Sequence, residues 1–362
     1  MSTVNTTNLK NVASDVNNIV LSTSGDTTVV SMNNGQLAGL RNRIINGNCQ
    51  VAQRPSVDVT GTDQYYGGPD RFYATKNNDT AGSFTQSQEQ LVSGGRIDTV
   101  RQTVVNAVTD LSGTKDWHGI NQRIEGYNCY DLTFSPFSVS FIFKTNVSGT
   151  FSMCVRNGAH TQSYVSTFDA VALIPKRHTF SLPANPLLAI PNDDSTGLEI
   201  TVGFLNQGDY IADVPAAFGL GRFLNTWEEG SYLTASTCTN WGVQAGNYIE
   251  LTNLQVEKGT ESTPFEEIPY SLSLANCQRY YQKLSSLLCF RPGPDATTVA
   301  GQAVRAVQMR ANGTTTTTGG TNVDTPVVTG STAEYWLATG TASSTSLQAS
   351  VENLATNAEM TS

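Results

Sequence analysis

Residues 137–144 read FSVSFIFK, and their large apolar side chains recur at every second position. Successive side chains of a β-strand point to opposite faces, so the three phenylalanines and Val139 share one face. The segment TFSMCVR at 150–156 continues the alternation after a short TNVSG turn, which predicts a hairpin with one buried face. LEITVGFL at 198–205 repeats the pattern. We therefore expect an all-β protein.

Strand patterns of this kind are dense between Arg41 and about Tyr270, and no helical segments alternate with them. This arrangement predicts a body at 41–270 that folds as an antiparallel jelly roll or β-sandwich. One strand of this body, YIELTNLQVEKG at 248–259, moves its apolar positions from one face to the other at Thr252-Asn253. A β-bulge, which inserts one extra residue into a strand, produces this change of phase.

The segment RNRIINGNCQVAQR at 41–54 marks the start of the body. We expect it to form the first strand, with Ile45 and Val51 buried. Asn46-Gly47 would make a turn or a bulge, where β-branched residues do not fit. Because the first and last strands of a jelly roll commonly lie close together, its expected neighbour is the bulged strand at 248–259.

The N-terminal residues 1–40 form a region distinct from the body. They contain two short β-prone runs, Ile19–Leu21 and Thr27–Val30, separated by a turn signal. A region of this size cannot bury a core alone. We therefore expect it to pair with other copies of itself, to pair with another protein, or to remain loose.

The C-terminal part divides into a short helix with a connector at 271–290 and a Thr/Gly-rich β domain at 291–362. The helix is expected near 272–284, because apolar residues recur there at helical spacing. The C-terminal domain has few large apolar residues for an isolated monomer, which favours oligomerisation. The apolar stripe of the helix consists of Leu274, Cys277, Tyr281 and Leu284.

Composition excludes several classes of partner. The net charge is −9, with a pI near 4.8 and only 14% charged residues, so the basic surface of a nucleic-acid-binding protein is absent. No apolar run reaches the ~20 residues that span a bilayer, and the N-terminus has no secretory signal pattern. The six cysteines are scattered without a CxxC pair, so we expect free thiols and no metal site.

Catalytic motifs are not apparent. The chain has three histidines and lacks G-x-S-x-G, H-E-x-x-H and P-loop patterns, so we expect neither an enzyme nor a cofactor. Aromatic residues beside Gly, Thr or Asn are the better functional signal, because exposed rings stack on sugars while neighbouring amides bind hydroxyls. The candidate receptor- or glycan-binding residues are Tyr335, Trp336, Trp227 and Trp241.

Two segments together carry a family resemblance. The first is NRIINGNCQVAQR at 42–54, followed by Asp-Arg-Phe at 70–72, and the second is LQVEKGTESTPFEEIPYSLSLANCQRYYQKL at 254–284. In this order they resemble a family of tail fibre and related virion proteins of tailed bacteriophages. Phe72 stands where the family usually has Trp, and Cys49 stands where a larger apolar residue is usual.

The resemblance implies a body similar to a carbohydrate-binding module, followed by a distal tip, in a virion protein that is usually a homotrimer. The implied partners are further copies of the chain, tail or baseplate proteins bound through residues 1–40, and a glycan or receptor of the host surface. The protein would be assembled in the host cytoplasm and carried on the virion. The helical stripe would then pack around the threefold axis, with the three copies of Tyr281 and Leu284 together.

Three other functions stay open. The first is a structural fibre of the head, collar or baseplate without a receptor. The second is a depolymerase of surface polysaccharide, and the third is a free-standing bacterial lectin. Phage depolymerases tend to be long β-helices, and no repeat of fixed period is visible. The absence of a secretory signal counts against the lectin.

Overall fold

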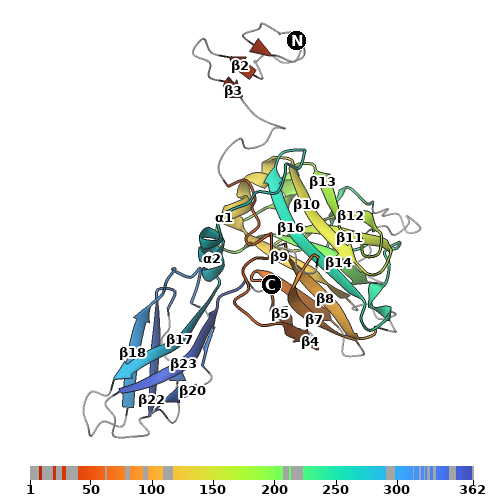
Figure 1. Cartoon of the computed structure of the whole chain (residues 1–362). Helices are drawn as coiled ribbons and strands as arrows, with labels where there is room; N and C mark the ends of the chain where they lie inside the picture. Colours follow the sequence, from red (N-terminus) through yellow and green to blue (C-terminus); the bar gives the residue numbers. More distant parts are fainter. Residues whose placement is uncertain are drawn as a thin grey trace, which may run out of the picture.

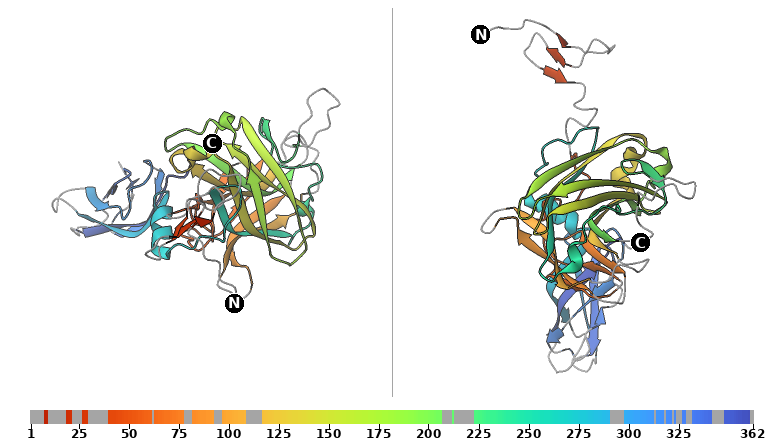
Figure 2. Two further views of the ribbon diagram at one scale, coloured as in Figure 1. Left: turned by 90° about the horizontal axis from the view of Figure 1, so that it is seen from above. Right: turned by 90° about the vertical axis from the view of Figure 1, so that its right-hand side faces the viewer.

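The computed structural model describes short N-terminal strands and most of the chain from Leu40 onwards. The residues described are 8–9, 19–21, 27–29 and 40–360, except for 62, 78–81, 93–96, 109–116, 207–211, 213–222, 291–297, 313, 318, 322, 324–326, 329–331 and 342–347. Figures 1 and 2 show a large β-sheet body and a smaller sheet that projects from one end of it as a tip.

The body is an antiparallel β-sandwich, as the sequence predicts. Its first sheet has six strands in the order β13-β10-β16-β8-β7-β4, which span Lys176–Leu182, Phe137–Thr145, Tyr248–Lys258, Asp98–Asn106, Ser83–Gln90 and Val57–Val59. Its second sheet has seven strands in the order β15-β12-β11-β14-β9-β6-β5, which span Trp227–Glu229, Gln162–Ala170, Gly149–Asn157, Thr196–Asn206, Trp117–Glu125, Phe72–Asn77 and Gln64–Tyr66.

The core lies between these two sheets. The apolar face of β10 is fully buried, and the Phe143 ring packs 4.9 Å from the Phe151 ring of β11. These strands do not form the expected hairpin. They belong to opposite sheets, because β10 pairs with β13 and β16 whereas β11 pairs with β12 and β14. Alternation identified the buried faces correctly but left the partners of each strand open.

The predicted bulge in β16 is confirmed. The register of β10 on β16 shifts between Ser140 and Ile142, and Asn253 has a left-handed φ of 51°. Asparagine tolerates this conformation better than most residues because its short amide bonds locally. The bulge turns the apolar positions of the second half of β16 back to the core, so both Leu251 and Leu254 are buried.

The prediction that residues 41–54 form the first strand is wrong. This opening segment, residues 40–54, consists of turns and extended chain, and the first strand of the body is β4. Asn46 and Cys49 have φ values of 61° and 60°, which interrupt any strand. The Asn46 side chain stabilises the turn, since it donates to Val51 O at 2.9 Å and accepts from Val51 N at 3.0 Å.

The predicted neighbour of the opening segment is correct. Arg43 N donates to Val256 O at 2.8 Å, and Leu254 N donates to Gly47 O at 3.0 Å, so the segment lies along β16. A Cβ atom at Gly47 would lie 2.1 Å from Leu254 O, which explains the glycine at this contact. Val51 is buried as expected, whereas Ile44 rather than Ile45 is the buried isoleucine.

Two helices and three short 3-10 turns complete the body and its junction with the tip. The helices are α1 (Gly126–Cys129) and α2 (Tyr270–Gln278), and the turns are η1 (Tyr130–Phe134), η2 (Pro186–Leu188) and η3 (Trp241–Val243). The predicted helix to 284 is therefore too long, because α2 ends at Gln278 and the chain enters β17 at Tyr281. β17 pairs with β23 from Tyr281 to Phe290, and this ladder overrides the helical spacing.

The tip is a single antiparallel sheet that encloses a small core. Its order is β19-β23-β17-β18-β22-β21, spanning Thr314–Thr316, Gln348–Asn357, Tyr281–Phe290, Thr298–Val304, Tyr335–Thr341 and Val327–Val328, and β20 (Gly319–Thr321) also pairs with β23. Because β17 is a central strand, the tip sheet begins at Tyr281, inside the region predicted as a connector. The core residues are Leu287, Cys289, Val299, Val323, Trp336, Ala338, Val351 and Leu354.

The N-terminal region contains a small antiparallel sheet of β1 (Asn8–Leu9), β2 (Ile19–Leu21) and β3 (Thr27–Val29). β2 pairs with β3 through Ile19 opposite Val29, as the two β-prone runs predict. The turn expected between these runs lies outside the described residues.

Candidate functional site

The two segments that carry the family resemblance meet at the junction between body and tip. Arg71, which precedes β6, is 2% exposed and stacks its guanidinium 3.5 Å from the centre of the Tyr280 ring. The same guanidinium forms an ion pair with Glu359 near the end of the chain and donates to Arg123 O at 2.9 Å. A planar guanidinium suits this site because it can stack and form directed hydrogen bonds at once.

Arg54 makes a second bridge across the junction. Its guanidinium lies 3.7 Å from the centre of the Tyr281 ring and 3.2 Å from Glu359 Oε1. It also lies 3.6 Å from Asp70 Oδ1. Burial raises the pKa of Asp70 to about 6, although Arg54 and hydrogen bonds from Gln53 oppose this shift.

The last described residues return from the tip to the body. Ala358 N donates to Tyr280 O at 2.8 Å. Met360 O accepts from Arg123 Nη1 at 2.6 Å and from the Tyr66 hydroxyl at 3.2 Å. The C-terminal end therefore fastens the tip to the second sheet of the body, beside which the C-terminus is drawn in Figure 1.

A buried carboxylate, Glu199 of β14, organises the adjoining face of that sheet. It accepts hydrogen bonds from the Tyr73 hydroxyl at 2.5 Å and from Arg123 Nε at 2.8 Å, and it pairs with Arg156. Burial alone would raise the pKa of Glu199, but Arg156, His160 and Arg123 together hold it well below its usual value. Glu199 is therefore ionised, and its contacts link β14 to β6, β9 and β11.

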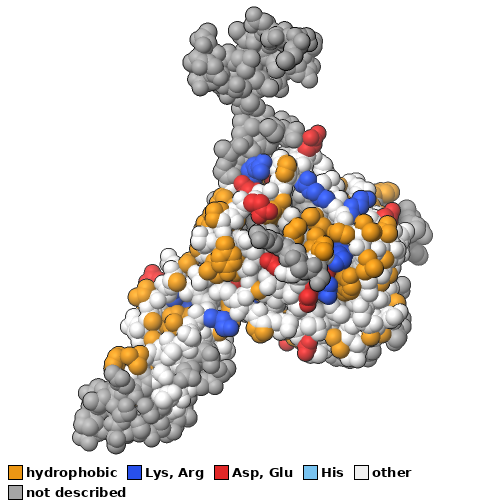
Figure 3. Space-filling view, in the orientation of Figure 1, with side chains coloured by type: hydrophobic (Ala, Val, Ile, Leu, Met, Phe, Trp, Pro, Cys, Tyr) orange, Lys and Arg blue, Asp and Glu red, His pale blue; other side chains and the backbone are white. Residues whose placement is uncertain are grey.

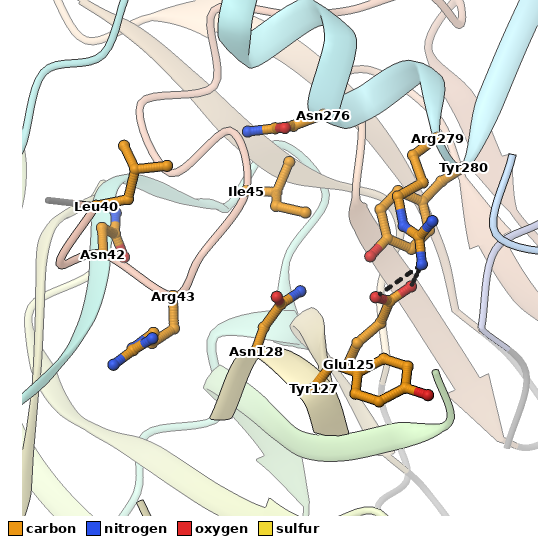
Figure 4. Close-up of a pocket in the computed structure, with 10 residues that line it drawn as sticks. All are labelled: Leu40, Asn42, Arg43, Ile45, Glu125, Tyr127, Asn128, Asn276, Arg279 and Tyr280. Carbon is orange, nitrogen blue, oxygen red and sulfur yellow. Dashed lines mark hydrogen bonds and ion pairs between the residues drawn. The ribbon is translucent and has the colours of Figure 1, made fainter. Parts of the chain in front are cut away.

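A pocket of about 340 Å³ lies beside the junction, between the opening segment, α1 and α2 (Figure 4). Glu125, at the end of β9, forms part of its wall and is paired with Arg279 at 3.2 Å and with Arg310 at 3.4 Å. A smaller hollow of about 50 Å³ adjoins it under the opening segment. The residues that line the larger pocket are Leu40, Asn42, Arg43, Ile45, Glu125, Tyr127, Asn128, Asn276, Arg279 and Tyr280.

None of the four aromatic residues predicted to bind a receptor lines this pocket. Trp241 is fully buried in the body core, with Nε1 donating to Gly203 O at 2.9 Å. Trp227 is half-buried against that core and donates to Pro183 O at 2.8 Å. Trp336 is 2% exposed in the tip core, where the guanidinium of Arg305 lies 3.9 Å from its ring.

The expectation that Trp336 is an exposed ring is therefore wrong. The curled tip sheet encloses it from several strands at once, which the composition of residues 291–362 did not indicate. Tyr335 points to the opposite face and is half-buried. Of the two tip aromatics, only Tyr335 retains substantial access to solvent.

The predicted trimer stripe is divided between two elements. Leu274 and Cys277 lie on α2, and Cys277 is fully buried. Tyr281 and Leu284 lie on β17, where Tyr281 stacks on Arg54 and Leu284 packs against the tip core. The four residues therefore do not form a stripe on one helix.

The pocket residues were missed because no local pattern marks them. Asn128 and Asn276 are isolated amides that lie 148 positions apart, and only the packing of α2 against α1 and the opening segment brings them together. Arg279 and Tyr280 belong to the CQRYY part of the second motif. That motif was the one available signal, although it gave no indication of their role.

Several titratable groups elsewhere in the chain are buried. Burial lowers the pKa of His118 to about 3, and its ring stacks on Phe84 at 3.6 Å. All six cysteines are free thiols, and five are buried. Over the residues that the structure describes, no group of three or more His, Cys, Asp or Glu side chains is placed to hold a metal ion. No helix in the same residues is long and apolar enough to cross a membrane.

Figure 3 shows charged side chains of both signs scattered over this face of the body, among apolar side chains. Several exposed apolar side chains lie near the pocket, including Tyr127 at 61% and Leu40 at 53% exposure.

No protein-family model matches the chain, and no curated protein matches it in sequence. Among solved structures, a family 4 carbohydrate-binding module is similar at 12% identity, with 59% of this chain and 97% of that chain covered and a TM-score of 0.29. A sugar-binding protein of Bacteroides thetaiotaomicron is similar at 12% identity, with 60% and 100% covered and a TM-score of 0.32.

The enzymatically active domain of tailspike protein 4 from bacteriophage CBA120 is similar at 10% identity. This likeness covers 60% of this chain and 21% of that chain, with a TM-score of 0.28. The chain is an all-β protein with an antiparallel sandwich body and a small β tip.

Proposed function

We propose that this chain is a structural fibre protein of a tailed-bacteriophage particle and that it contacts a glycan or receptor on the host surface. The observation that carries the proposal is the position of the two family-like motifs. Their residues Arg54, Arg71, Tyr280 and Tyr281 stack in pairs across the junction of body and tip. The motifs therefore describe how two β modules are joined, and they contain no arrangement of catalytic groups.

The joint is built to be stiff, which suits a fibre. Arg71 and Glu359 are each about 2% exposed at the side chain, and their ion pair fastens the end of the tip to the body. Removing one partner of a buried ion pair costs several kcal/mol of stability, so separating the tip from the body at this contact is also costly. A fibre needs this property because the distal module must stay at a fixed distance from the particle.

The proposal includes three further parts. Residues 1–40 attach the protein to tail or baseplate proteins of the virion. The protein is a homotrimer, which raises a weak affinity per site through effective concentration. It has no catalytic activity of its own, and it reaches the virion after assembly in the host cytoplasm.

Locating the protein on phage particles tests the proposal. Purified particles would be labelled with an antibody against the tip and examined by electron microscopy, alongside particles that carry a deletion of residues 1–40. We expect label at the end of a fibre, and no label after the deletion, although the truncated protein keeps its β-sheet circular dichroism. Absence of label from intact particles would refute a virion protein, and retention after the deletion would refute anchoring through residues 1–40.

The same preparation separates the remaining roles. A receptor-binding fibre, added in excess, competes with particles for adsorption to host cells, whereas a head, collar or baseplate fibre without a receptor does not. A depolymerase releases new reducing ends from host polysaccharide, which a colorimetric assay detects. Sedimentation at micromolar concentration tests the homotrimer, and a monomer there would refute it.

A further inference from the structure

The junction pocket contains polar groups that the fold itself does not use. The Tyr280 side chain is fully buried, and its hydroxyl lies beside Glu125 and Arg279 without a hydrogen bond of ordinary geometry to either. A buried polar group without a partner costs free energy, so a ligand that satisfies it gains affinity.

Two amides extend this set of available groups. The side chains of Asn128 and Asn276 line the pocket from α1 and α2, and they approach its centre from different sides (Figure 4). Asn42, by contrast, is fully used by the fold, since its amide bonds Leu254 O at 3.1 Å and Val256 N at 3.1 Å. The pocket therefore offers one buried hydroxyl and two amides to a ligand.

The charges around the pocket are neutralised within the chain. Arg279 lies 3.2 Å from Glu125, and Arg43 lies 3.2 Å from Asp131. Each cation that lines the pocket thus has a carboxylate partner, so neither an anionic nor a cationic ligand would find an uncompensated charge. The free groups are neutral donors and acceptors, which match neutral hydroxyls.

The remaining wall is apolar and partly aromatic. The Tyr127 ring is 61% exposed at the mouth of the pocket, and Ile45 lies within it. A sugar ring presents C–H groups on its faces and hydroxyls at its rim, so it can pack against an aromatic side chain while bonding amides. The volume of about 340 Å³ lies at the lower end of the range for small-molecule sites, about 300–1,000 Å³.

We propose that the junction pocket binds one or two neutral sugar units of a cell-surface glycan. Tyr280, Asn128 and Asn276 hydrogen-bond the sugar hydroxyls, and Tyr127 packs against a C–H face. This assignment deepens the proposed function, on which the choice of a cell-surface glycan as the source of the sugar rests. The pocket's own chemistry specifies the neutral sugar.

The buried wall of the pocket is positioned before any ligand arrives. The Tyr280 ring is held by the Arg71 guanidinium at 3.5 Å, and Tyr280 O accepts from Ala358 N at 2.8 Å. Burial raises the pKa of Tyr280, so its hydroxyl stays protonated and can donate near neutral pH. A fixed donor loses little conformational entropy on binding, which favours affinity.

Saturation-transfer difference NMR on the full-length protein tests the assignment. The probes are glucose, galactose, mannose and N-acetylglucosamine with their disaccharides, together with glucuronic and sialic acids as anionic comparisons. We expect at least one neutral sugar to bind with a Kd on the order of 1 mM. Tyr280→Phe, which keeps the ring on Arg71, should weaken binding roughly three- to tenfold, as should the double variant N128A/N276A.

Gln244→Ala is the control, because Gln244 is an exposed amide remote from the pocket lining and its loss should leave the Kd unchanged. Circular dichroism confirms that each variant is folded. Unchanged binding in both pocket variants would overturn the site, and preference for the anionic sugars would overturn the ligand class. Absence of binding to every probe would also overturn the assignment. The location of the protein on particles decides the proposed function independently of these results.

Discussion

Replacing Glu359 by alanine should destabilise the protein more than any surface change in the tip. Its side chain is 2% exposed and pairs with Arg71 and, at 3.2 Å, with Arg54. After the change Arg54 still has Asp70 at 3.6 Å, but Arg71 retains only a carbonyl and an aromatic ring. The variant therefore leaves a buried guanidinium without a counter-charge.

Removing one partner of a buried ion pair costs about 3–5 kcal/mol. A typical domain has about 5–15 kcal/mol of stability, so this loss is a large fraction of the total. Urea unfolding followed by tryptophan fluorescence measures it, because Trp241 and Trp336 are buried in the body and the tip respectively. With an m-value of about 1–3 kcal/mol per molar urea, the midpoint should fall by roughly 1–5 M.

Two comparisons make the test specific. Glu334→Ala removes an exposed carboxylate from the same domain and should change stability by about 0.5 kcal/mol or less. The double variant R71M/E359M replaces the pair by apolar side chains and should recover much of the loss. If Glu359→Ala proves no more destabilising than Glu334→Ala, the C-terminal contact does not hold the tip, and the reasoning about a stiff joint is wrong.

Three further predictions concern the body and the tip. Because burial lowers the pKa of His118 to about 3, well below its value of about 6.5 in an unfolded chain, the stability it contributes is complete above pH 6.5 and decreases as pH falls towards 3. This contribution to the free energy of unfolding falls by about 3 kcal/mol between pH 6.5 and 4. Urea unfolding at the two pH values measures the fall, and His118→Phe should remove it. If the variant keeps the pH dependence of the original protein, His118 is not its source. Gly47→Ala places a Cβ atom 2.1 Å from a backbone oxygen of β16 and should cost about 1–3 kcal/mol by thermal unfolding, whereas Asn48→Ala in the same turn should cost much less; equal effects would show that the turn can move. Trp336→Ala should lower the free energy of unfolding by about 3–5 kcal/mol and Tyr335→Ala by about 1 kcal/mol or less. The reason is that Trp336 faces the tip core, whereas Tyr335, its neighbour on β22, faces the other side. A larger loss for Tyr335→Ala would place the core on the other face of β22.

The sequence by itself determined the structural class and much of the body. Alternation over 137–144 marked the buried face of β10 correctly, because side-chain direction in a strand is a local property of the backbone. The phase change at Thr252-Asn253 correctly predicted the bulge of β16 for the same reason. The opening segment was correctly placed beside β16, although its turn geometry was taken for a strand.

The tertiary structure alone decided which strands pair and which side chains are buried. β10 and β11 are neighbours in sequence but lie in opposite sheets, since alternation specifies a face and leaves the partner open. Trp336 becomes core because the curled tip sheet surrounds it, although its own sequence context is rich in Thr and Gly.

The candidate site depends on contacts of still longer range. Arg71 and Glu359 are 288 residues apart, and no local pattern relates two residues at such a separation. The pocket is likewise formed from the opening segment, α1 and α2, which are far apart in the sequence. The sequence could therefore identify the motifs at the junction, but only the folded chain shows that they join body to tip and that a pocket lies beside them.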